Sequence, residues 1–158
     1  MNDQLRKEWQ EEERCAQIHG WDFSHIDGRF SEELPPWSFR DCITAVLTPQ
    51  MRLLDIDTGG GEFLRSLHHP PQMTAAAEGY PPNIRLCEEE LLPLGIDFRA
   101  ADAGGALPFD DASFDIVINR HGSLNFREIY RVLKPGGVFL TQQVGADNER
   151  ELVQMMLP

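Results

Sequence analysis

The sequence predicts an α/β fold, a doubly wound sheet of five mainly parallel strands with helices on both faces. Short apolar segments alternate with amphipathic ones along most of the chain, an order typical of parallel βαβ units with right-handed crossovers. One apolar segment, 51–56, leads into three consecutive glycines and then into a helical pattern. The length of 158 residues suits one domain that buries its own core.

The predicted elements follow one another in a regular order. Proline and glycine mark many of their ends, because neither residue continues a helix or a strand readily. Ser38 can cap the first helix of the alternating region, since its hydroxyl can accept a backbone N–H. We expect helices at 3–17, 38–47, 60–68, 82–93, 124–133 and 147–156. We expect the first three strands at 51–56, 73–79 and 96–102, a fourth strand that ends at 119, and a fifth strand that follows a turn at 135–137.

The chain divides into an N-terminal part, 1–37, and a main domain, 38–158. The N-terminal part combines a polar helix with an aromatic, turn-rich stretch that contains Trp21, Phe23 and Trp37. These aromatic side chains can cover a bound ligand as a lid that excludes water, or they can pack on a face of the sheet. We favour packing on the sheet and keep the lid as an alternative.

The glycine turn is the first candidate for a binding site. A tight turn at the carboxyl end of the first strand of a doubly wound sheet brings backbone amides against a nucleotide-like ligand. A dinucleotide fingerprint needs Gly or Ala where Leu64 stands, and a P-loop needs Gly-Lys-Ser/Thr, which the chain lacks. From the glycines alone, a turn that binds nothing remains an alternative.

Five segments in this order resemble the class I S-adenosylmethionine-dependent methyltransferases. Asp55, Gly59 and Gly61 match the family's first motif, D-x-G-x-G-x-G, whereas Asp57 stands where the family usually has its first glycine. The other four are the strand ends within 73–79 and 96–103, the fourth-strand signature in 107–119, and the helix, turn and strand in 129–140. The resemblance covers about residues 38–145 and implies a Rossmann-like domain that binds S-adenosyl-L-methionine, with S-adenosyl-L-homocysteine as product.

The resemblance also implies which residues would hold the cofactor. A carboxylate at the end of the second strand, here Glu78, would accept hydrogen bonds from the ribose hydroxyls. Asp102 would contact the adenine amino group, and the backbone N–H of Ala103 would meet the ring. Asp55 would shape the turn or reach the methionine ammonium through water. The implied cofactor-binding residues are Asp55, Asp57, Gly59, Gly61, Glu78, Asp102, Ala103 and Asn119.

Asp57 is the main departure from the family pattern. Its backbone is either strained in a conformation that glycine adopts easily or ordinary within a shifted turn. In both cases its carboxylate points near the place of the methionine moiety, where it attracts the ammonium group or crowds the carboxylate. We expect crowding, because like charges repel.

The end of the fourth strand carries the candidate catalytic residues. Methyl transfer requires a positioned nucleophile and, for some acceptors, removal of its proton. The sequence Asn119-Arg120-His121-Gly122 follows this strand, which faces the methyl group in this family. We expect His121 to act as the base, since imidazole titrates near neutrality, and Arg120 to hold an anionic substrate. The alternative is that His121 only fixes the loop through a backbone contact.

Composition and net charge indicate which classes of binding partner the protein has. The net charge is −12, whereas a nucleic-acid methyltransferase usually presents a basic face to phosphates. The chain shows no apolar run long enough to span a bilayer and none shaped like a signal peptide. Its three cysteines lack C-x-x-C spacing, which argues against a disulfide framework and a zinc site. We therefore expect a cytoplasmic protein with no metal, no membrane contact and no nucleic-acid partner.

The sequence thus predicts an S-adenosylmethionine-dependent methyltransferase acting on an unidentified small molecule. The alternative is a non-catalytic or truncated module that binds the cofactor, and a nicotinamide-dependent oxidoreductase is disfavoured by the missing third glycine. Members of the family usually continue with two more strands, so we expect the main domain to be C-terminally truncated. A fifth strand without a neighbour would expose an edge through which two copies can pair as a homodimer.

Overall fold

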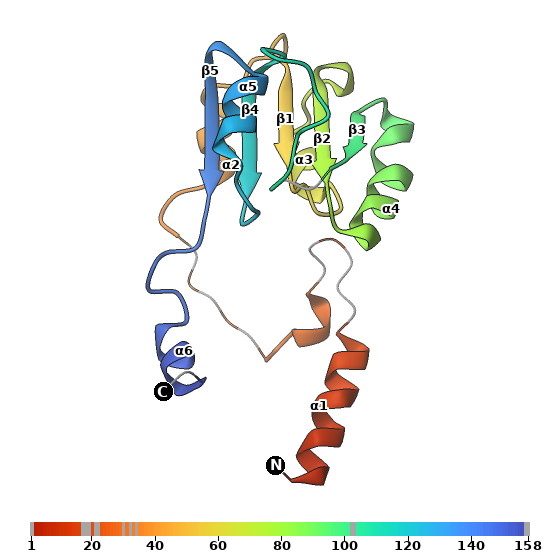
Figure 1. Ribbon diagram of the computed structural model, residues 1–158, viewed down its shortest axis with the longest axis vertical. Helices are drawn as coiled ribbons and strands as arrows, with labels where there is room; N and C mark the ends of the chain where they lie inside the picture. Colours follow the sequence, from red (N-terminus) through yellow and green to blue (C-terminus); the bar gives the residue numbers. More distant parts are fainter. Residues whose placement is uncertain are drawn as a thin grey trace.

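The structure is a computed structural model that describes residues 2–16, 20, 23–29, 31, 33, 35–101 and 104–156. These residues form one five-stranded sheet in the order β3-β2-β1-β4-β5, and every neighbouring pair is parallel (Figure 1). This confirms the predicted doubly wound α/β fold. The strands are β1 (Leu53–Ile56), β2 (Thr74–Glu78), β3 (Asp97–Ala100), β4 (Phe114–Arg120) and β5 (Leu133–Gln142).

Apolar side chains on the two faces of the sheet form two separate clusters. On one face α2 (Phe39–Thr44), α3 (Glu62–Ser66) and α4 (Pro81–Glu90) pack through residues that include Ile43, Leu64 and Cys87. On the other face α5 (Phe126–Val132) packs through Ile129 and Val132. β1 and β2 are buried along their whole length, as expected for central strands covered on both faces.

The helices begin where the sequence predicts but are shorter. Ser38 caps α2, with its Oγ accepting the N–H of Asp41 at 3.2 Å, and Asn125 caps α5 by accepting the N–H of Glu128 at 3.3 Å. The segment predicted as one helix over 82–93 is α4 followed by a short 3-10 turn, Leu92–Leu94. Pro93 explains the division, because proline cannot donate the hydrogen bond that would continue α4.

The predicted turn at 135–137 lies inside β5 instead of before it. Pairing with β4 moves from Phe114 with Leu133 to Ile116 with Val138, so the intervening residues of β5 form an irregularity in the ladder. Gly136, within this irregularity, has a φ of 81°, a conformation that glycine adopts without steric cost. The strand therefore begins before the turn, because Leu133 already pairs with β4.

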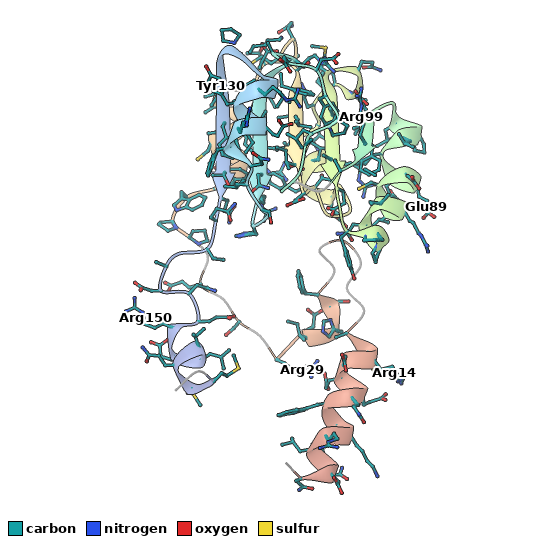
Figure 2. All side chains as sticks on the ribbon, viewed as in Figure 1. Arg14, Arg29, Glu89, Arg99, Tyr130 and Arg150 are labelled. Carbon is teal, nitrogen blue, oxygen red and sulfur yellow. The ribbon has the colours of Figure 1, made fainter. Side chains whose placement is uncertain are left out.

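Two terminal helices lie apart from the sheet, on the side toward which the strands' carboxyl ends point (Figure 1). They are α1 (Asp3–Cys15) and α6 (Arg150–Met156), and none of their described residues is buried. Figure 2 shows Arg14 and Arg150 on these helices, away from the densely packed side chains around the sheet. Among the described residues, no helix combines the length and apolar character that a membrane crossing requires.

Candidate functional site

A cavity of about 270 Å³ lies at the carboxyl ends of β1, β2 and β4. The strand order reverses between β1 and β4, and such a switch point leaves a crevice between the loops that leave the sheet in opposite directions. The residues that line the cavity are Gly20, Phe23, Asp57, Gly59, Glu78, Asn83, Arg120, His121 and Gly122. The structure thus brings together five of the residues proposed from sequence for the site, namely Asp57, Gly59, Glu78, Arg120 and His121.

The side chain of Glu78 holds the glycine turn through hydrogen bonds to backbone N–H groups. This side chain is only 4% exposed; its Oε2 accepts the N–H of Gly59 at 2.7 Å, and its Oε1 accepts the N–H groups of Gly79 and Tyr80 at 2.9 and 2.8 Å. Gly59 and Gly61 have φ values of 67° and 81°, which glycine adopts without steric cost. Each carboxylate oxygen has two lone pairs. Glu78 can therefore fix the turn and still accept hydroxyl groups of a ligand.

Asp55 supports the same turn from within the protein. It is 4% exposed, and its Oδ2 accepts the hydroxyl of Thr58 at 2.7 Å. Burial raises the pKa of Asp55 to about 7, although the hydroxyl of Thr58 and the positive charge of Arg120 oppose the rise. This placement suits a role in shaping the turn.

Asp57 has a left-handed backbone, with a φ of 56°. The first of the two conformations expected for it is therefore the observed one. Its Oδ2 accepts the backbone N–H of Ser123 at 3.0 Å, in the loop between β4 and α5. The carboxylate of Asp57 thus reaches from the first strand to the loop that carries His121. The crowding of a cofactor carboxylate by Asp57 stays a prediction.

The end of β4 is fixed by the side-chain amides of Asn119, which is buried, and Gln143, which is exposed. Asn119 is fully buried, donates from Nδ2 to the carbonyl of Ile56 at 3.0 Å and accepts from Nε2 of Gln143 at 2.8 Å. These contacts tie together the carboxyl ends of β1, β4 and the chain after β5. Asn119 therefore has a structural position that explains its burial, and its contact with a cofactor stays a prediction.

Arg120 and His121 follow Asn119 into the cavity. The guanidinium of Arg120 lies 4.4 Å from the ring centroid of Phe63, a cation–π contact. His121 has a φ of 57°, and its N–H donates to the carbonyl of Gln142 at 2.9 Å. Partial desolvation and the charge of Arg120 lower the pKa of His121, so the neutral imidazole is favoured at neutral pH. His121 thus makes a backbone contact that fixes the loop, the alternative role considered for it, and its imidazole is in the neutral form that can accept a proton. Its role as a base stays a prediction.

The N-terminal part also reaches the cavity. The N–H of Gly20 donates to Oδ1 of Asn83 at 2.9 Å, and Phe23 is among the lining residues. A Cβ at Gly20 would overlap the carboxylate of Glu62. The lid stays a prediction, and one of its aromatic residues, Trp21, lies outside the described residues, as do Asp102 and Ala103 of the expected adenine contact.

Comparison with known proteins identifies the family. Residues 54–141 match the family described as methyltransferase domain. This chain belongs to that family. The phthiotriol/phenolphthiotriol dimycocerosates methyltransferase of Mycobacterium tuberculosis is 38% identical over 98 residues, an alignment that covers 58% of this chain and 36% of that protein. The chain thus spans about a third of the length of this curated relative.

Two solved structures share the fold of this methyltransferase domain. The YcgJ protein of a Bacillus species is 23% identical with a TM-score of 0.59, covering 75% of this chain and 55% of that one. An S-adenosylmethionine-dependent methyltransferase from Mesorhizobium loti is 22% identical with a TM-score of 0.53, covering 65% and 52%. These likenesses confirm the Rossmann-like architecture.

Three contacts of this methyltransferase domain were not predicted from sequence. Asn83 lies in the first turn of α4, and no local sequence pattern points to its contact with Gly20. Phe63 stacks on Arg120, and Cys87 donates its thiol to the carbonyl of Gly59 at 3.0 Å. Burial raises the pKa of Cys87 to about 12, so it stays a thiol. In the described part of the chain, no group of three His, Cys, Asp or Glu side chains could hold a metal ion.

Proposed function

We propose that this methyltransferase domain binds S-adenosyl-L-methionine and transfers a methyl group from it to a small-molecule acceptor. One observation carries the proposal: the glycine turn, the Glu78 carboxylate and the loop with Arg120 and His121 converge on one cavity at the switch point of the sheet. When bound, the cofactor supplies an electrophilic methyl group on a sulfonium, and S-adenosyl-L-homocysteine leaves.

The chemistry of the lining suits this cofactor. The carboxylates of Asp57 and Glu78 and the guanidinium of Arg120 offer partners for a ligand with both positive and negative groups. A nicotinamide dinucleotide would bring two phosphate charges against these two carboxylates, which repel them. Glu78 would accept the ribose hydroxyls, the turn from Gly59 to Gly61 would carry the methionine end, and Asp102 and Ala103 would meet adenine.

Proton removal is assigned to His121. Its lowered pKa keeps the ring neutral at physiological pH, the form that accepts a proton from an acceptor's hydroxyl or amine. Arg120, whose guanidinium lies over the ring of Phe63, would bind an anionic group of the acceptor.

We propose a small, non-nucleic-acid acceptor and a cytoplasmic location. The relative from Mycobacterium tuberculosis is named for dimycocerosates, which are not nucleic acids. The net charge of −12 opposes binding to phosphate backbones. We also propose that β5, the last strand in the sheet order, can pair with a second copy as a homodimer.

Ligand titration tests the cofactor. S-adenosyl-L-homocysteine at about 100 times its Kd should stabilise the protein by about 2.7 kcal/mol, and NAD should leave the melting temperature unchanged. Stabilisation by NAD alone would overturn the proposal. Mass spectrometry of S-adenosyl-L-homocysteine formed with a panel of small hydroxyl, amine and carboxyl acceptors then separates the enzyme from a module that only binds.

A further inference from the structure

We propose that Asp57 is a positioning residue for the loop that carries His121, and that its carboxylate sets the spacing between the cofactor turn and this loop. The proposal rests on the proposed function for its consequence in catalysis. The contacts that carry it are independent of any ligand.

The backbone at Asp57 keeps the conformation that a glycine would adopt, yet the residue carries a side chain. A φ of 56° is costly for most residues with a Cβ, and Asp and Asn are among the few that tolerate it. A glycine would form the turn at lower cost. The side chain therefore contributes something that the turn alone does not need.

The carboxylate of Asp57 makes its contact in a distant part of the sequence. Oδ2 accepts the N–H of Ser123, 66 residues further on, at 3.0 Å. A hydrogen bond from a backbone amide to a carboxylate is stronger than one between neutral groups. The contact joins the end of β1 to the loop after β4, across the switch point of the sheet.

Gly122 shows that this contact shapes the loop. Gly122 does not have a positive φ, so its backbone conformation does not require glycine. A Cβ there would overlap Oδ2 of Asp57, lie 2.6 Å from the Cβ of Asp57 and lie 2.8 Å from Nδ2 of Asn119. Glycine is needed at 122 for space, and the side chain of Asp57 makes the two closest of these approaches.

Asp57, His121 and Gly122 line the same cavity. The N–H of His121 anchors one side of the loop to Gln142, and Asp57 anchors the other side through Ser123. Two anchors on opposite sides fix the place of His121 relative to the glycine turn. Removing the carboxylate should therefore release the loop while the turn itself remains.

The first test compares Asp57→Gly with the matched control Asp57→Asn. Asparagine tolerates the left-handed backbone and keeps an oxygen that can accept the N–H of Ser123, whereas glycine keeps only the conformation. Amide hydrogen exchange at Ser123 should accelerate at least about tenfold in Asp57→Gly and less than about threefold in Asp57→Asn. Unchanged exchange in Asp57→Gly would overturn the proposal.

The second test follows the His121 ring by NMR titration in the same two variants. Loss of a nearby carboxylate lowers the pKa of an imidazole, whereas better solvation of the ring raises it. Both variants remove the carboxylate and only Asp57→Gly releases the loop, so the pKa of His121 should be higher in Asp57→Gly than in Asp57→Asn. Equal pKa values in the two variants would show that Asp57 does not position the loop and would overturn the proposal.

The third test is a double-mutant cycle. Gly122→Ala should lower the melting temperature clearly in the wild type and less in Asp57→Gly, because the overlaps with Asp57 are then gone and only the close approach to Nδ2 of Asn119 remains. Equal losses in both backgrounds would contradict the proposal. Titration of the wild type with S-adenosyl-L-homocysteine tests the proposed function separately, since absent binding would leave the results for Ser123 and His121 unaffected.

Discussion

The ends of β1 and β4 lie side by side, and the residue after each strand has a left-handed backbone conformation. Asp57 and His121 each follow the last residues of their strands with nearly the same left-handed φ, 56° and 57°. Asp57 contributes its side chain to a backbone contact with Ser123, whereas His121 is anchored by its own N–H to Gln142. Residues after both strand ends line the cavity. In the proposed function, the residues after β4 supply the groups that take part in the chemistry.

The largest expected effect is at the β4 end. His121→Asn keeps a residue that tolerates the left-handed backbone but removes the base, so the rate of methyl transfer should fall about 10²–10⁴-fold. Binding of S-adenosyl-L-homocysteine should stay the same. Calorimetry and product formation on the same preparation measure the two quantities. A rate within a factor of two of the wild type would remove His121 from the mechanism.

At the β1 end the largest expected effect is on stability. The pKa of Asp55 is raised to about 7 in the folded state, above its ordinary value near 4. The folded protein therefore binds more protons between these values. The stability associated with Asp55 is fully present below about pH 4 and is lost as pH rises through about 7, by at most about 4 kcal/mol.

Asp55→Asn checks this pH dependence. Denaturant unfolding at pH 5 and pH 8 should show less loss of stability at pH 8 in the variant than in the wild type. The pKa of Glu128 is lowered to about 2, mainly by its hydrogen bond with Arg131. The stability that Glu128 contributes is therefore lost only at acidic pH and does not change between pH 5 and pH 8. An identical pH slope in both proteins would contradict the raised pKa of Asp55.

Glu78→Gln should affect both the ligand and the turn. The side chain accepts three backbone N–H groups, and an amide places N–H donors where one oxygen accepted. We expect unfolding without ligand to become about 1 to 3 kcal/mol easier, and binding of S-adenosyl-L-homocysteine to weaken by a similar amount. Thermal unfolding and calorimetry measure the two. Unchanged affinity would separate Glu78 from the ligand.

The smallest expected effect comes from glycine substitutions at the two left-handed positions, 57 and 121. His121→Gly should raise stability by up to about 1 kcal/mol, because glycine relieves the left-handed backbone and the anchor to Gln142 is a backbone contact that remains. Asp57→Gly gains the same relief but loses the bond to Ser123, so its stability should not rise. Denaturant unfolding measures the free energy of unfolding of the two variants. An equal increase in both would show that the two strand ends are equivalent.

The sequence by itself determined the order of elements, the parallel sheet and the polar strand ends. Alternating apolar segments, the glycine turn and the acids at Asp55 and Glu78 are local patterns, and local patterns report the strand or helix in which they lie. The resemblance to the methyltransferase family added the expectation that Glu78, Arg120 and His121 belong to one site.

Only the tertiary structure decided which partner each polar group takes. Nothing near Asp57 in sequence indicates Ser123, nothing near Gly20 indicates Asn83, and the irregularity within β5 appears only when its register with β4 is known. Asn119 shows the same limit, since no local pattern indicates that its amide joins Ile56 to Gln143. Such contacts depend on the strand order and on the path of each loop, and these are set by packing the whole chain at once.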